Sequence, residues 1–254
     1  MNRIEKVISG ASAFVRRCES AFVGLERVSA HTVVSTSGWV ADDVGSYCGQ
    51  CGSSMFDQGH SCQRSVGANL IAHGTVVRLS RYESPMSEWI RAMKYGSWHS
   101  MAEVLGSRLG RSILDSRVFA DIEAPLLVPV PMPLGRRFAR GMDHAHIVCR
   151  SVSKETGFKV VQPLRQRRGD VQSGATLSKR SRKRDPFALS LPGWLCMRRL
   201  EGREVIVIDD VRTTGRTLGL VSRALRRCGA CVVGVGVLAV ADHSRSIEAC
   251  RRGS

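Results

Sequence analysis

Two adjacent acids followed by a short loop rich in threonine and glycine form the part of the sequence best suited to chemistry. The acids are Asp209 and Asp210, and the loop covers residues 213–217. Carboxylate oxygens accept hydrogen bonds from neighbouring sugar hydroxyls, and they can also hold water on a magnesium ion that a ligand brings. The threonines of the loop supply hydroxyl donors, and Gly215 lets the backbone turn tightly. The pattern predicts a site for a phosphorylated sugar.

A buried strand and a helix must hold these residues in place. The four β-branched residues of 205–208 are typical of a strand that is covered on both faces, and Leu218, Val221 and Leu225 recur at helical spacing. The segment therefore predicts a strand, a loop and a helix, whose first free amides favour a phosphate group. Open parallel sheets bind their ligands at this end of the strands. The alternative interpretation is a buried strand with an incidental acidic turn.

A second strand, loop and helix unit precedes the first. The apolar run of 126–130 predicts a buried strand, the loop of 135–141 is basic, and Asp143 is suited to cap the next helix. Four further elements are expected: helices over 85–95 and 101–113, separated at Gly96, and strands over 160–164 and 232–240. Together these elements predict an α/β fold.

The N-terminal part has a different character. Residues 4–25 keep the apolar spacing of an amphipathic helix, and the following serine- and glycine-rich segment contains Cys48 and Cys51 in a C-x2-C arrangement. Such a pair presents two thiolates to one metal, and a tetrahedral zinc ion needs two more ligands. The candidates are Cys62 and His60, with Cys18 as a substitute for His60. The alternative is a loop with ordinary reduced cysteines, and this simpler interpretation is favoured for Cys228 and Cys231, next to an apolar run.

Composition limits the possible classes of protein. With 254 residues, 43% of them hydrophobic, the chain is long enough for one α/β core and a small appendage. No apolar stretch predicts a membrane span, and Glu5, Arg16 and Arg17 interrupt the N-terminal pattern, so a signal peptide is not indicated either. We expect a cytosolic protein whose nine cysteines are thiols or metal ligands rather than disulfides.

The positive charge is large and partly concentrated in one stretch. Thirty-eight Lys and Arg against 22 Asp and Glu give a formal net charge of +16, which favours polyanionic partners without identifying one. Residues 165–185 hold eight cations and two acids. Such a run is either a solvated loop or a loop that closes over a polyphosphate.

The segment from Val205 to Leu218 resembles the 5-phosphoribosyl 1-pyrophosphate (PRPP) signature of type I phosphoribosyltransferases. Several segments together resemble the ComF family of phosphoribosyltransferase-like proteins, and they follow one another in the family's order. They are the cysteine-rich piece, RAMKYG over 91–96, VPVP over 128–131, RGMDH over 140–144, the basic stretch with Gln172, Leu177 and Arg182, and IDDVRTTGRTL over 208–218. Asp185, where the family often has Asn, and the position of Gln172 depart from the pattern.

The resemblance implies a type I phosphoribosyltransferase fold, a parallel sheet flanked by helices, over 67–254, after an N-terminal helix and zinc-ribbon-like segment over 1–66. It implies PRPP as ligand with Mg2+, and a link to uptake of single-stranded DNA together with other DNA-uptake proteins. The implied PRPP-binding residues are Val130, Pro131, Asp209, Asp210, Thr213, Thr214, Gly215, Arg216 and Thr217, with Asp210, Asp209 and Arg140 as catalytic candidates. Two functions follow: phosphoribosyl transfer to a nitrogenous acceptor, or single-stranded DNA binding with a vestigial or regulatory PRPP site.

Overall fold

The structure is a computed structural model of the whole chain, and it describes residues 29–55, 74–96, 98–133, 135, 141–166, 187–190 and 193–241. The expected N-terminal helix, the boundary at 66 and 67, Cys18, His60, Cys62, Arg140 and most of the basic stretch lie outside these residues. Among the described residues, no helix has both the length and the apolar character needed to span a membrane.

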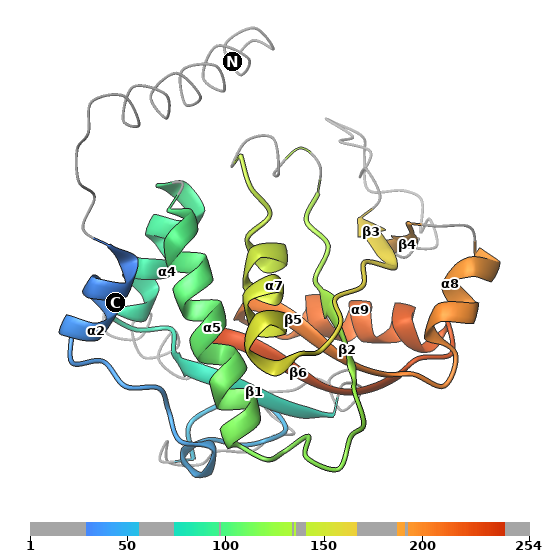
Figure 1. Cartoon of the computed structure of the whole chain (residues 1–254), viewed down its shortest axis with the longest axis horizontal. Coiled ribbons are helices and arrows are strands. Elements are labelled where there is room, and N and C mark those ends of the chain that lie inside the picture. The colour runs from blue at the N-terminus through green and yellow to red at the C-terminus, as the bar shows by residue number, and fades with distance from the viewer. Residues whose placement is uncertain are drawn as a thin grey trace, which may run out of the picture.

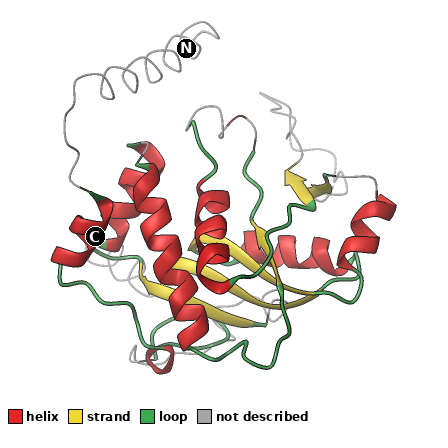
Figure 2. Cartoon of the chain, in the orientation of Figure 1, coloured by secondary structure: helices red, strands yellow, loops and turns green. Residues whose placement is uncertain are grey.

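A four-stranded parallel sheet forms the centre of the molecule (Figures 1 and 2). Its strands, in spatial order, are β1 (Thr75–Arg81), β6 (Cys231–Val240), β5 (Glu204–Arg212) and β2 (Leu126–Pro129). Val160 extends it beyond β2 through a parallel bridge to Leu127. A small antiparallel pair, β3 (Leu164–Gln166) and β4 (Phe187–Leu189), lies apart from this sheet. The carboxyl ends of all four parallel strands therefore meet at one edge.

Both faces of the sheet are covered, because each strand contributes residues to two different cores. In β5, Ile206 and Ile208 join one core, whereas Val205 and Val207 join the other. The first core contains residues of α2 (Ala30–Thr36), α4 (Met86–Tyr95), α5 (His99–Asp115) and α7 (His144–Thr156). The second contains residues of α9 (Arg216–Arg226), together with Leu200 at the end of α8 (Gly193–Leu200). The continuous apolar runs predicted to be buried strands are thus buried on both sides.

The helices α5 and α7 lie side by side on the first face (Figure 1). Glycines allow this close approach. A Cβ atom at Gly106 of α5 would lie 2.8 Å from the carbonyl oxygen of Val148 in α7, which is too close for any side chain. At Gly110, one turn later, a Cβ would lie 3.3 Å from Cα of Val152. The position of α7 over the sheet therefore depends on these two small residues.

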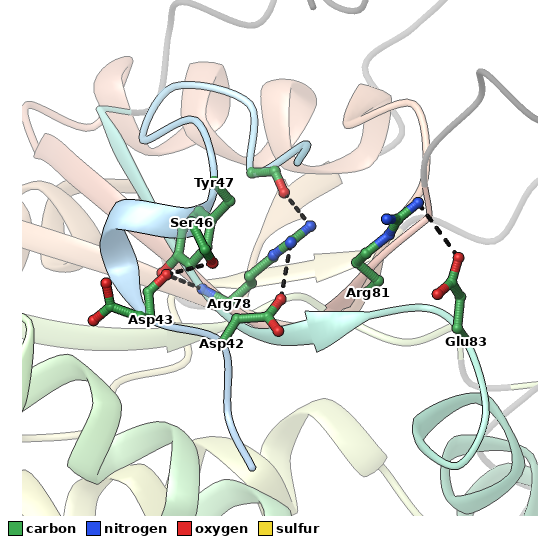
Figure 3. Close-up of polar contacts among 8 residues, drawn as sticks. Asp42, Asp43, Ser46, Tyr47, Arg78, Arg81 and Glu83 are labelled. Atoms are coloured by element: carbon green, nitrogen blue, oxygen red, sulfur yellow. Dashed lines mark hydrogen bonds and ion pairs between the residues drawn. The ribbon is translucent and has the colours of Figure 1, made fainter. Parts of the chain in front are cut away.

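The segment before the sheet is bonded to β1. The Asp42 N–H donates to Leu79 O at 2.7 Å, and the Val76 N–H donates to Gly49 O at 2.6 Å. Arg78, only 2% exposed, forms an ion pair with Asp42 at 2.8 Å, and its guanidinium lies over the Tyr47 ring (Figure 3). It also donates a hydrogen bond to the Gly52 carbonyl. The charge of a buried arginine is thus balanced by a residue that precedes the sheet in sequence.

Most expected elements are present with small shifts of their ends. The helices expected over 85–95 and 101–113 are α4 and α5, and the last strand is β6. One expected strand differs in the structure, and β1 was missed. The strand expected over 160–164 is a single bridge at Val160 followed by β3, since Leu164 pairs with Leu189 rather than with the central sheet. β1 was not predicted, because Arg78 and Arg81 interrupt its apolar pattern.

Candidate PRPP site

The acid pair lies at the carboxyl-end edge of the sheet, within β5 rather than beyond it. We expected the strand to end before Asp209, but β5 continues to Arg212 because β6 still pairs with it, Asp209 opposite Val237 and Arg212 opposite Val240. On its other side, β2 ends with Pro129 opposite Ile208. The two acids therefore extend past the end of β2 and border the loop that follows it.

That loop begins with the two residues expected to bind pyrophosphate. The Val130 N–H donates to Ile208 O at 2.9 Å, directly before Asp209, and the Val130 side chain is buried. Pro131 is half-buried at the start of the loop. The two strand ends that the sequence predicted to form one site are thus adjacent.

The Thr/Gly loop links β5 to α9. Gly215 has φ of 69°, the left-handed conformation that favours glycine, and is followed directly by the first residue of α9. Thr214 Oγ1 lies 3.4 Å from the Arg216 amide and accepts its N–H, and the first intrahelical bond runs from Gly219 N–H to Gly215 O. Thr213, Thr214, Arg216 and Thr217 are exposed. Hydroxyls and first-turn amides are therefore accessible to a phosphate from solvent.

Lys94 is a site residue that the sequence analysis did not single out. It lies in the last turn of α4, and its Nζ is 3.0 Å from Asp210 Oδ2, with side-chain exposures of 19% and 14%. The signal that could have identified it is the RAMKYG segment, one of those carrying the family resemblance. Its place beside Asp210 could not be predicted, because α4 and β5 are distant in sequence.

The start of α7 fixes the end of α4. Asp143 Oδ1 accepts the His146 N–H at 3.2 Å, which confirms Asp143 as the cap of this helix. His144 is fully buried, and its Nε2 lies 2.8 Å from Met93 O. A carbonyl oxygen only accepts, so Nε2 carries the proton and donates. This bond holds the helix turn that carries Lys94.

Burial and neighbouring carboxylates determine the electrostatics of the site. Asp209 accepts the Asp210 N–H at Oδ1, 2.9 Å away. Burial raises the pKa of Asp209, and the charges of Asp210 and, less strongly, Asp143 raise it further. The Asp210 N–H bond and the positive charge of Lys94 act in the opposite direction. The edge of the sheet therefore brings several acidic side chains together, with one half-buried lysine against them.

The C-x2-C pair forms a tight turn far from the acids in sequence. Gly52 N–H donates to Cys48 O at 2.6 Å, Cys48 N–H donates to Ser53 O at 2.9 Å, and Tyr47 forms an antiparallel bridge with Ser54. Cys51 is buried, and Cys48 is half-buried. Within the described part of the chain, no cluster of three possible metal ligands occurs. Of the other pair, Cys228 is buried as expected, whereas Cys231 is exposed.

Comparison with known proteins supports this description. A model of the phosphoribosyl transferase domain matches residues 150–249, which include the acid pair and the Thr/Gly loop. "Competence protein F" of Haemophilus influenzae is 25% identical over 187 residues, covering 72% of this chain and 80% of that protein. The chain contains a phosphoribosyltransferase domain, and over most of its length it is similar to a protein of the ComF type.

Further relatives of this chain carry names that refer to DNA use or to phosphoribosyl transfer. "DNA utilization protein YhgH" of Escherichia coli (strain K12) is 28% identical over 167 residues, covering 64% of this chain and 70% of that protein. A shorter match, 46% identical over 50 residues, is to "Adenine phosphoribosyltransferase" of Mycolicibacterium smegmatis, and it covers 20% of this chain and 28% of the enzyme. The resemblance to the ComF family and the α/β phosphoribosyltransferase fold expected from the sequence are confirmed.

Proposed function

We propose that this ComF-type protein binds PRPP and transfers its 5-phosphoribosyl group to a nitrogenous acceptor, releasing pyrophosphate. The observation that carries the proposal is the convergence, at one edge of a parallel sheet, of the acid pair, the Thr/Gly loop and the loop after β2. Each of the three fits one part of PRPP. The carboxylates suit the ribose hydroxyls, the threonines and first-turn amides suit the 5-phosphate, and Val130 and Pro131 border the place for pyrophosphate.

The chemistry needs no side-chain nucleophile. The bond between C1 of the ribose and the pyrophosphate oxygen breaks, a bond from C1 to the acceptor nitrogen forms, and the nitrogen loses a proton. Positive charge develops on the ribose as pyrophosphate leaves, so binding and orientation do most of the work. The acid pair supplies carboxylates near the ribose that can hold this proton. Arg140, outside the described residues, is the proposed cation for the leaving group.

Magnesium fits the same residues. Its preferred ligands are carboxylate and phosphate oxygens and water, and Asp209 and Asp210 offer carboxylates at consecutive positions of β5. The charges of Asp210 and Asp143 act on Asp209, and a cation bound beside the acid pair would offset them. When bound, the ion would neutralise charge on the departing pyrophosphate, and Asp209 and Asp210 would hold it through water.

Calorimetry tests the proposal directly. Titration of PRPP in the presence of magnesium should give saturable binding, and a screen of nitrogenous bases should find one that releases pyrophosphate. Absence of PRPP binding would contradict the proposal. Binding without turnover for any acceptor would favour the second candidate.

The second candidate is a single-stranded DNA-binding protein in which the PRPP site has a regulatory or vestigial role. The observations that favour it are the net charge of +16 and the relatives named for DNA utilization and competence. Both proposals predict that the protein is cytosolic and that other DNA-uptake proteins are its partners.

A structural zinc ion held by Cys48, Cys51 and Cys62, with His60 or Cys18 as fourth ligand, is a separate proposal. The tight turn that carries Cys48 and Cys51 supports it, because two thiols on one turn suit one half of a tetrahedral site.

A further inference from the structure

Lys94 occupies an unusual position for a lysine. Its ammonium group and the Asp210 carboxylate are 3.0 Å apart and both largely shielded from water, with 19% and 14% of their side chains exposed. Withdrawing two charges from water is costly, and an apolar pair of similar size is often as stable. A stabilising role alone is therefore a weak explanation for an ion pair at the edge of the sheet where the ligand binds.

The surroundings place Lys94 opposite the Thr/Gly loop. Ile90 and Met93 of α4 belong to the core on one face of the sheet, whereas Leu218 and Val221 of α9 belong to the core on the other. The acid pair lies in β5, between the two helices. A ligand whose 5-phosphate is bound at the start of α9, and whose ribose hydroxyls contact the acids, directs its opposite end away from α9.

The charges around Lys94 suggest what it contacts. The charges of Asp210 and Asp143 both act on Asp209, and Lys94 is the cation that acts on Asp209 among the described residues. PRPP is itself a polyanion, so its pyrophosphate must approach a negatively charged edge. A lysine that shares its charge between a carboxylate and a phosphate oxygen lowers that barrier.

We infer that Lys94 binds the pyrophosphate end of the ligand, which makes it a further ligand-contacting residue of this site. The inference rests on the proposed function and adds a residue from α4 to a site otherwise built from β5, α9 and the loop after β2. His144, through its bond to Met93 O, is the positioning residue that holds the last turn of α4 and thus the ammonium group.

The test compares three variants by calorimetry in magnesium buffer: Lys94→Met, Lys94→Arg, and Arg91→Met as the matched control. Arg91 lies on the same helix and is exposed, so its replacement removes the same charge away from Asp210. The probes are PRPP, inorganic pyrophosphate and ribose 5-phosphate. We expect Lys94→Met to bind PRPP and pyrophosphate at least tenfold more weakly than wild type and to bind ribose 5-phosphate within twofold of wild type. Lys94→Arg should recover most of the lost affinity.

Three outcomes would overturn the inference. The first is an unchanged affinity of Lys94→Met for pyrophosphate. The second is a loss of pyrophosphate affinity in Arg91→Met as large as that in Lys94→Met. The third is a loss of ribose 5-phosphate affinity in Lys94→Met as large as its loss of pyrophosphate affinity, which would mean that Lys94 only supports the acid pair. Thermal unfolding of each variant identifies any that does not fold. If Lys94→Met does not fold, the pyrophosphate affinity of Lys94→Arg, which keeps the charge, tests the inference instead. If the wild-type protein binds pyrophosphate but not PRPP, the proposed transfer fails while the pyrophosphate measurements still decide the role of Lys94. If it binds neither, both are overturned.

Discussion

Burial and the neighbouring carboxylate of Asp210 raise the pKa of Asp209, so the folded protein holds a proton on this side chain more readily than the unfolded chain does. The stability that this protonation contributes is complete below the ordinary carboxyl pKa of about 3.9, and it is lost as the pH rises through the raised value. Asp209→Asn cannot ionise. As the pH rises from about 4 to neutrality, we therefore expect the free energy of unfolding of this variant to fall less than that of wild type, by on the order of 1 kcal/mol.

Urea denaturation at several pH values measures this difference. Asp121→Asn is the control, because Asp121 is exposed and lies in the loop before β2, at the opposite edge of the sheet. Parallel stability curves for wild type and Asp209→Asn would contradict the electrostatic description of the acid pair.

The same acids should determine ligand affinity. Replacing both, Asp209→Asn with Asp210→Asn, removes charged acceptors for ribose hydroxyls, and hydrogen bonds to charged groups contribute roughly 1.5 to 3 kcal/mol each. We expect PRPP binding at least tenfold weaker, with the far-ultraviolet circular dichroism unchanged. The double variant Asp121→Asn with Glu123→Gln changes the charge equally at two exposed residues and should bind as wild type does. An unaltered dissociation constant in the folded site variant would remove the acids from the site.

At the scale of elements, the bond between α7 and α4 links the stability of the first core to the site. His144→Ala leaves the buried Met93 carbonyl without its donor, at a cost of about 1 to 3 kcal/mol. We expect a lower Tm and, because the turn that carries Lys94 is released, weaker PRPP binding. His31→Ala, at an exposed position of α2, should change neither. A lower Tm with undiminished PRPP affinity would mean that the bond serves the core alone.

The turn that carries Cys48 and Cys51 gives a second prediction at this scale. Elemental analysis of protein purified without chelators should find one zinc per chain, and Cys48→Ser with Cys51→Ser should abolish it. Cys231→Ser changes an exposed thiol outside the proposed set and should retain the metal. Metal-free wild-type protein would end this proposal.

Local patterns explain which elements could be predicted. The unit of β5, loop and α9 is contiguous, so its apolar strand, left-handed Gly215 and helical spacing are all visible in one stretch of sequence. β1 was missed because a buried arginine interrupts it, and Arg78 is compensated by Asp42 from another segment. Lys94 was missed for the same reason, because its partner Asp210 is distant in sequence and only the fold brings the two together. Long-range charge pairing leaves no local signal.

For the molecule as a whole, the excess of positive charge separates the two candidate functions. Reversing Lys179, Arg180, Arg182 and Lys183 to Glu should flatten the salt dependence of single-stranded DNA binding, since each lost phosphate contact removes roughly 0.7 from the slope. Fluorescence anisotropy with a labelled oligonucleotide over a salt series measures it. The control reverses Arg91, Arg198, Arg199 and Arg226, all exposed, for the same change in net charge.

Equal slopes in wild type and the first variant would exclude the basic stretch as a DNA contact. Equal flattening in both variants would assign the effect to net charge. If the stretch instead closes over pyrophosphate, its reversal should raise the concentration of PRPP needed for saturation.

The contacts between residues 42–52 and β1 have a consequence for assembly. β1 is the outer strand of the central sheet, and an uncovered outer strand is a template on which a second chain can add its own strand. Here the Val76 and Arg78 amides already donate to Gly49 O and Tyr47 Oη. The chain thus supplies its own cover at these positions, and sheet extension from one copy to the next would first have to displace it.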